Sequence, residues 1–283
     1  MNRKISFQIE TIDGHQLAVD LFLPEIPGTE KLSTLVYCHG FKGFKDWGFV
    51  PHLNQFLVTE NLALITFNHS HNGVITRDFD DLESFADNSV GQELRDLESL
   101  ALWIVNEGKE LYNFDPENIN WLGHSRGGGN VILFAKLFPE YVKKAITWAA
   151  IDTFTHILRG LDKEQWKKEG RVYIENARTK QQMPLNYFIY EEYIQNEKKY
   201  SILDAANSLT KPLLIVHGTA DQSVPFSSAE NIYNACAHSI LYKVEGGDHT
   251  FGVAHPIQGL QDVNKDFWLM LDNTLEFIED TEI

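Results

Sequence analysis

Cysteine is scarce in this sequence: only Cys38 and Cys236 occur among 283 residues. Two thiols do not make the disulfide framework of a small secreted scaffold, and they fit a reducing compartment. Long apolar runs are also absent, since no stretch approaches the roughly 20 residues that a membrane-spanning helix needs. Arg3 and Lys4 are not followed by the apolar segment of a signal peptide. We therefore expect a cytoplasmic protein that has no membrane partner.

Basic residues are few as well. The 24 lysines and arginines are outnumbered by 40 acidic residues, which gives a formal net charge of −16. A field of that sign repels phosphate backbones, so we expect no nucleic-acid partner. The hydrophobic fraction of 43% suffices for a core and excludes disorder as the main state. Length and composition leave the oligomeric state open.

Short apolar runs recur along the chain and predict its strands. Two alternating runs, 5–11 and 17–23, flank Asp13-Gly14 and predict an antiparallel hairpin. Later runs are nearly continuous and rich in β-branched residues, which is typical of strands buried on both faces of a parallel sheet. These runs are 35–38, 62–67, 119–122, 145–149, 213–216 and 240–244.

Helical patterns lie between these strands. Apolar residues in 90–104 recur at intervals of three and four, and Ser89 and Gln92 are placed as a capping box. Two further helices are predicted over 127–138 and 267–278. The alternation predicts an α/β fold, with a mostly parallel sheet and helices on both faces. We expect a single domain over 1–283, with a helical cap insertion at 152–208, a charged stretch without strand signals.

The sharpest motif is Gly123-His124-Ser125-Arg126-Gly127, which matches the pattern G-x-S-x-G. It stands between a predicted strand and a predicted helix, where such a motif forms a sharp turn with the serine at its tip. Glycines two residues before and after the serine leave room for that turn. Ser125 is therefore the candidate nucleophile. The alternative is a glycine-rich turn that only packs closely or binds a phosphate.

A serine hydroxyl needs a base, and the base needs an acid that orients it. Asp221 and His249 both follow predicted strands, in the chain order Ser, Asp, His that this motif predicts. Because the carboxyl ends of parallel strands lie along one edge of a sheet, the three side chains should meet there. Asp152 and Asp248 are rival acids, since Asp152 also follows a strand and Asp248 adjoins the histidine.

Acyl transfer also requires hydrogen-bond donors for an oxyanion. The first candidate is the backbone N–H of Arg126, directly after the nucleophile. The second is the N–H of Phe41, in the loop that follows the first parallel strand. We assign three neighbours of these groups, His39, Gly40 and His124, to substrate binding.

Four motifs together resemble the α/β-hydrolase superfamily: HGFKG at 39–43, GHSRGG at 123–128, HGTAD at 217–221 and GGDH at 246–249. The pattern is most similar to dienelactone-hydrolase-like and cinnamoyl (feruloyl) esterase-like proteins. This resemblance implies a carboxylic ester hydrolase with a Ser-His-Asp triad and no cofactor. The cysteine nucleophile of typical dienelactone hydrolases and the aspartate of haloalkane dehalogenases are absent, because position 125 is serine.

The sequence thus predicts a serine hydrolase that cleaves carboxylic esters of small to medium size through an acyl-enzyme. A peptidase, an amidase or a thioesterase would use the same triad, and a non-catalytic scaffold of this fold would only bind. A zinc site built from His39, His52, His69 and His71 is another alternative, but their spacing lacks a metal-site pattern. We expect no metal.

Overall fold

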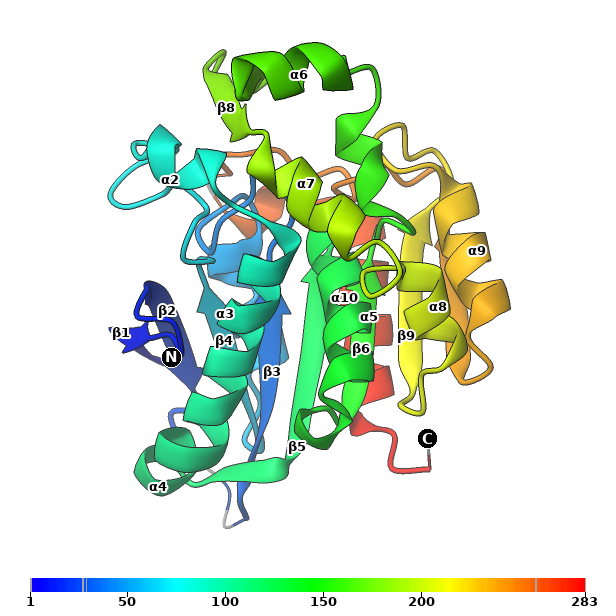
Figure 1. Ribbon diagram of the computed structural model, residues 1–283. Coiled ribbons are helices and arrows are strands. Elements are labelled where there is room, and N and C mark those ends of the chain that lie inside the picture. Colours follow the sequence, from blue (N-terminus) through cyan, green and yellow to red (C-terminus); the bar gives the residue numbers. More distant parts are fainter. Residues whose placement is uncertain (1, 27, 29, 258, 283) are drawn as a thin grey trace.

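One eight-stranded sheet forms the centre of the protein (Figure 1). The computed structural model describes residues 2–26, 28, 30–257 and 259–282. In spatial order the strands run β1-β2-β4-β3-β5-β6-β9-β10. Their bounds are β1 (Arg3–Glu10), β2 (Gln16–Leu23), β3 (Leu32–Cys38), β4 (Leu62–Phe67), β5 (Phe114–His124), β6 (Lys144–Trp148), β9 (Leu213–Gly218) and β10 (Ser239–Val244).

The strand pairing follows the two kinds of apolar pattern in the sequence. The alternating runs form the antiparallel pair β1–β2, and β2 also pairs antiparallel with β4. In the rest of the sheet, which runs β4-β3-β5-β6-β9-β10 in space, all neighbouring strands are parallel. The predicted hairpin and the predicted parallel sheet are therefore both confirmed.

Helices cover both faces of the sheet, as predicted. The larger core lies on the side of α3, α5, α8 and α9, and the second core lies on the side of α1 and α10 (Figure 1). Successive residues of β5 contribute to opposite cores, with Trp121 in the first and Leu122 in the second. This explains the continuous apolar runs, because both faces of these strands are buried. The helices are α1 (Asn54–Leu57), α2 (Leu82–Ala86), α3 (Val90–Trp103), α4 (Lys109–Tyr112), α5 (Arg126–Leu137), α6 (Lys163–Glu169), α7 (Phe188–Gln195), α8 (Ile202–Asn207), α9 (Phe226–Ala235) and α10 (Lys265–Glu279).

The predicted capping box before α3 is only half formed. The Ser89 hydroxyl accepts a hydrogen bond from the Gln92 backbone N–H at 3.2 Å. The Gln92 side chain does not reach back to Ser89, because its amide donates to Ser70 and Asp96. The residue that would complete the cap thus belongs to a buried polar network instead.

The insertion after β6 is not purely helical, which corrects the sequence-based expectation. It contains the antiparallel pair β7 (Arg171–Glu175) and β8 (Gln182–Asn186) besides α6 and α7. Every residue of β7 is either half-buried or exposed, so its apolar pattern is weak. At the far end, α8 packs against α5 and α9 and so belongs to the helical layer of the sheet. The covering part of the insertion therefore ends before residue 202 (Figure 1).

Within the described ranges, no helix combines the length and the apolar character that crossing a lipid bilayer requires.

Candidate active site

Ser125 occupies a strained turn between β5 and α5. Its backbone angles are φ 57° and ψ −118°, a conformation that a non-glycine residue rarely adopts. The Ser125 N–H donates to the carbonyl of Trp148 on β6 at 2.8 Å. A Cβ atom on Gly123 would lie 2.2 Å from the carbonyl oxygen of Gly127, and one on Gly127 would lie 2.3 Å from that of Cys38. Only glycine fits at these two positions, as the motif predicts.

Asp221 and His249 form a hydrogen-bonded pair at the same edge of the sheet. The loops after β9 and β10 bring His249 Nδ1 to 2.7 Å from Asp221 Oδ2. The other carboxylate oxygen, Oδ1, accepts the backbone N–H groups of Ser223 and Val224 at 2.8 and 2.9 Å. Both oxygens are therefore held in place, and one of them orients the imidazole.

The Asp221 carboxylate is kept ionised by these contacts. Burial acts to raise its pKa, but hydrogen bonds from His217 and His249 and from the Val224 N–H outweigh burial and hold the pKa well below its usual value. At neutral pH, Asp221 is therefore a fixed anion that favours the Nδ1–H tautomer of His249 and leaves Nε2 free to accept a proton.

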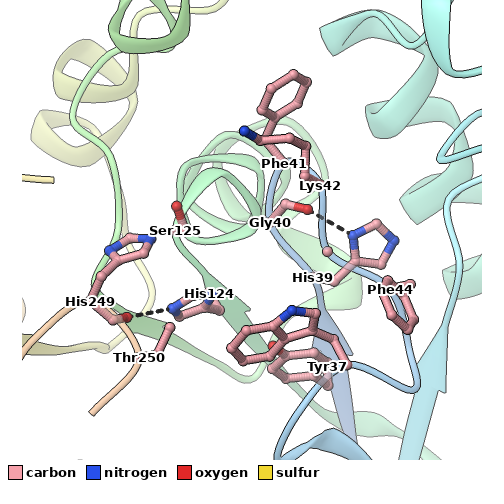
Figure 2. Close-up of a pocket in the computed structure, with 12 residues that line it drawn as sticks. Tyr37, His39, Gly40, Phe41, Lys42, Phe44, His124, Ser125, His249 and Thr250 are labelled. Carbon is pink, nitrogen blue, oxygen red and sulfur yellow. Dashed lines mark hydrogen bonds between the residues drawn. The ribbon is translucent and has the colours of Figure 1, made fainter. Parts of the chain in front are cut away.

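The Ser125 hydroxyl and the His249 imidazole line the same cavity and face the same space (Figure 2). Among the described residues, no hydrogen bond joins the two side chains, and His249 bonds only through Nδ1 and its backbone. Nucleophile–base hydrogen bonds of hydrolases often become short only when a substrate is bound. The three predicted side chains are thus gathered at one site.

The loop that follows β3 lies directly against the nucleophile. A Cβ atom on Gly40 would be 2.8 Å from the His124 carbonyl oxygen and 3.0 Å from Ser125 Cβ, so this close approach requires glycine. The carbonyl of Gly40 accepts hydrogen bonds from His39 Nδ1 and the Gly43 N–H.

These two bonds fix the orientation of the next N–H. In a planar trans peptide, the carbonyl of Gly40 and the N–H of Phe41 point in opposite directions. The carbonyl points toward His39 and away from Ser125 (Figure 2). The Phe41 N–H therefore points toward the nucleophile. The Arg126 N–H, as the first of α5, has no intrahelical acceptor. Both candidate oxyanion donors are thus available beside Ser125.

The protein engages both ring nitrogens of His39 and the Nε2 of His124, the two histidines assigned to substrate binding. His39 Nε2 accepts the backbone N–H of His69 at 3.2 Å, and His39 Nδ1 donates to Gly40. His124 Nε2 donates to the carbonyl of His249 at 2.8 Å. Both line the cavity, but their contacts suit the positioning of other groups. His39 holds the loop 39–43, here called the oxyanion loop, and His124 holds the candidate base His249.

His124 gives this site a testable pH dependence. Burial, with the nearby His249, lowers the pKa of His124 to about 3. An unfolded histidine titrates near pH 6.5, so the unfolded chain binds an extra proton between these values and the free energy of unfolding falls as the pH is lowered.

We expect His124→Gln, which retains an N–H donor, to reduce the loss of stability between pH 7 and pH 5 by about 2 kcal/mol. Urea unfolding at both pH values measures this, and His238→Gln, an exposed position, is the control. If His124→Gln lost as much unfolding free energy between pH 7 and pH 5 as the wild type, that result would contradict a neutral His124 in the folded protein.

A buried polar network that the sequence motifs did not predict lies under the site. Glu93 on α3 accepts hydrogen bonds from Arg126 Nε at 2.7 Å and from Asn130 at 2.8 Å. Burial acts to raise the pKa of Glu93, but the charges of Arg126 and His69 and the hydrogen bonds from Asn130 and Arg126 together lower it. Asp96, one turn further along, bonds His69 and Ser70. Both acids fall on the apolar face of the predicted helix. Charged residues on a face that is expected to be buried could have indicated this network.

The rival groups have other partners. Asp152 binds His156, Ser228 and Asn231, and Asp248 Oδ1 accepts backbone N–H groups of its own loop. His217 donates to the carbonyl of Val224 and also approaches Asp221 Oδ2 at 3.3 Å. Neither rival acid is bonded to His249 within the described residues.

The histidines of the alternative metal site do not converge. The ring of His69 lies against His39, but Asp96 and Cys38 occupy its two nitrogens. His71 packs against His15 instead. Within the described part of the chain, no group of three or more His, Cys, Asp or Glu side chains is arranged to hold a metal.

Comparison with known proteins identifies the family. Residues 78–251 match the prolyl oligopeptidase family, and this segment contains Ser125, Asp221 and His249. The chain belongs to the prolyl oligopeptidase family. It is a serine hydrolase of the α/β-hydrolase type, as the motifs predicted. The human serine hydrolase BPHL is 26% identical over 147 residues, which are 47% of this chain and 49% of that protein. The chain thus spans about half the length of this curated relative.

Solved structures agree with the fold of this family member. Est1E from Butyrivibrio proteoclasticus superposes with a TM-score of 0.71 and 19% identity, over 96% of this chain and 97% of that one. Its complex with ferulic acid gives a TM-score of 0.73 and 22% identity over the same shares. The acylaminoacyl peptidase of Pyrococcus horikoshii gives 0.68 and 19%, over 98% of this chain and 41% of the peptidase. These likenesses confirm the predicted α/β-hydrolase fold.

Proposed function

We propose that this serine hydrolase cleaves carboxylic esters through an acyl-enzyme on Ser125. The observation that carries the proposal is the convergence of three features on one cavity. They are the strained turn at Ser125, the bond between Asp221 and His249, and the oriented N–H of Phe41. Nucleophile, oriented base and oxyanion donors are the parts that acyl transfer requires.

The first half of the reaction forms the acyl-enzyme. His249 Nε2 takes the proton of the Ser125 hydroxyl as the oxygen attacks the ester carbonyl carbon. The carbonyl oxygen becomes an oxyanion and accepts the N–H groups of Phe41 and Arg126. Asp221 stabilises the imidazolium that forms. The tetrahedral intermediate then collapses, the imidazolium gives its proton to the departing alkoxide, and the alcohol leaves.

The second half restores the serine. A water molecule gives a proton to His249 Nε2 while its oxygen attacks the acyl carbon, and the same N–H groups hold the second oxyanion. Collapse of this intermediate breaks the bond to Ser125, which regains its proton from the imidazolium. The carboxylic acid product then departs.

An amide or peptide substrate is the second candidate, because the family match is to prolyl oligopeptidases. Two observations favour esters instead. Est1E corresponds to this chain over nearly the full length of both, whereas the Pyrococcus peptidase corresponds over only 41% of its own chain. The motif set of this sequence is also similar to that of feruloyl esterases.

The test is covalent labelling with a fluorophosphonate probe, followed by peptide mass spectrometry. We expect an adduct on Ser125 in the native chain and none in the His249→Ala variant, because the hydroxyl needs its base. A panel of ester, thioester and aminoacyl-amide substrates that share one acyl group then identifies the bond. The ester is expected to have the highest kcat/KM. Labelling elsewhere, or a preference for the amide, would contradict the proposal.

A further inference from the structure

Two cavities meet at Ser125. One has a volume of about 130 Å³ and lies beside the oxyanion loop (Figure 2). The other, about 390 Å³, lies between that loop and the insertion, where it is lined by Ile151, Phe154 and Ile174. Four residues line both: Phe41, Lys42, Ser125 and His249. Lys42 therefore borders the space that a ligand at Ser125 occupies, whichever of the two cavities holds it.

Lys42 occupies a costly backbone position. Its φ is 59°, in the left-handed region that glycine or asparagine adopts more easily. The side chain is half-buried, with Nζ 5.8 Å from the centre of the Phe41 ring. Burial lowers the pKa of this ammonium group. A lysine maintained under strain and partial desolvation points to a role for its charge.

Lys42 also lacks a counterion. Among the described residues, no carboxylate lies within 4.0 Å of its Nζ, whereas Lys45, three residues later, pairs with Asp20 at 2.6 Å and Asp46 at 2.7 Å. The two lysines share one loop, but only Lys45 is neutralised by the protein. The difference leaves the Lys42 charge available to a ligand.

A second cation borders the larger cavity. The Arg126 side chain is buried, and its guanidinium carbon lies 5.6 Å from the centres of the Phe41 and Phe154 rings. Its Nε is bonded to Glu93. Its two terminal nitrogens have no acceptor in the part of the chain that the structure describes. They form a fork of the kind that binds carboxylates.

The charge of these cavities is opposite to that of the whole protein. The chain has 40 acidic residues and a net charge of −16, yet no described residue that lines either cavity is an aspartate or a glutamate. Lys42 and Arg126 lie against the same ring, at 5.8 and 5.6 Å from its centre. A cationic pocket in an acidic protein selects an anionic ligand.

We propose that the substrate is an ester that carries a free carboxylate, which binds to Lys42 and Arg126 while the ester group lies at Ser125. This inference rests on the proposed ester hydrolysis and names its substrate class. The carboxylate supplies the missing counterion of Lys42 and accepts the terminal N–H groups of Arg126. An ester with a hydrocarbon chain in the same place leaves Lys42 without a counterion and the terminal N–H groups of Arg126 without an acceptor, which disfavours it.

The test compares acids with matched neutral esters. In the first pair, 4-nitrophenyl hydrogen adipate and its methyl ester place the carboxylate on the acyl side. In the second, 3-carboxyphenyl butyrate and its methyl ester place it on the alcohol side. We expect the acid to exceed its neutral partner by about 10-fold in kcat/KM in at least one pair, since an ion-paired hydrogen bond is worth that much.

Lys42→Asn is the decisive variant, because asparagine tolerates the left-handed backbone and the chain should fold at least as stably. We expect this variant to lose the acid-to-neutral ratio and to keep or raise the wild-type melting temperature. Lys42→Arg, which retains the charge, is expected to restore the ratio. Lys45→Asn, in the same loop, is the matched control and should leave the ratio unchanged.

The outcomes separate this inference from the proposed function. Hydrolysis of the neutral esters with a ratio near one in both pairs overturns the carboxylate site and leaves the esterase intact. An equal loss of the ratio in Lys42→Asn and Lys45→Asn also overturns it. The total positive charge of the loop, and not a contact with Lys42, would then be the cause of the preference. Failure of all four esters overturns ester hydrolysis itself, and this inference with it.

Discussion

Alanine in place of Ser125 is expected to lower kcat/KM for any ester substrate by about 10⁴- to 10⁶-fold. The residual rate comes from binding and from the oxyanion donors, which are backbone groups and remain. The fold should be retained, because the Ser125 N–H and carbonyl make the structural contacts and the hydroxyl makes none among the described residues. The measurement is the steady-state rate of purified variant and wild type, together with their melting temperatures.

A matched serine variant controls for that loss. Ser227 is exposed at the start of α9 and lines neither cavity, so Ser227→Ala should retain wild-type turnover. If Ser125→Ala kept a tenth of the wild-type rate with a normal melting temperature, another nucleophile would have to be responsible.

Asparagine in place of Asp221 is expected to lower kcat by about 10⁴-fold with little change in the fold. The amide oxygen would stay at the Oδ1 position, because the N–H groups of Ser223 and Val224 require an acceptor there. The NH₂ group then faces His249 Nδ1, where the wild type has an acceptor at 2.7 Å. His249 would have to place its proton on Nε2, and that nitrogen would no longer accept the proton of Ser125. The measurement is kcat on the ester preferred by the wild type.

The rival acid provides the control for this prediction. Asp152→Asn removes a charge at the same edge of the sheet, but Asp152 bonds His156 and residues of α9 and does not bond His249. We expect its rate to stay within about threefold of wild type, the range of a change that leaves the reacting groups in place. A larger loss in Asp152→Asn than in Asp221→Asn would reverse the assignment of the acid.

The sequence predicted the parts of the fold that are determined by local burial and by steric limits on the backbone. Strands buried on both faces must be continuously apolar, so runs such as 62–67 and 213–216 identify the parallel sheet directly. Chain reversal at Ser125 requires glycine at 123 and 127, because any Cβ there would overlap a backbone carbonyl. The order of Asp221 and His249 follows from the topology, since both lie in loops at the carboxyl edge of the sheet.

Other features depend on contacts distant in sequence and left weaker traces. Strand β7 is only half covered, so no buried alternation marked it. Both ring nitrogens of His39 and the Nε2 of His124 are bonded within the protein, to partners that no spacing rule predicts. The pairing of Glu93 with Arg126 joins positions 33 residues apart. The left-handed φ of Lys42 is also invisible in the sequence, because the residue found there is not the one such a backbone favours.

The covering part of the insertion leaves and rejoins the sheet without contributing a member of the candidate triad or an oxyanion N–H. The candidate catalytic groups all lie in the turns that follow β3, β5, β9 and β10. The candidate triad, the oxyanion N–H groups and the proposed carboxylate contacts of Lys42 and Arg126 therefore lie outside the cover, which adds residues such as Ile174 to the larger cavity. A designer who grafts another relative's cover between residues 158 and 201 would change which molecules reach Ser125 while the reaction itself is inherited intact. Natural divergence has the same route open to it, with drift in the cover producing new substrate ranges on a constant catalytic frame.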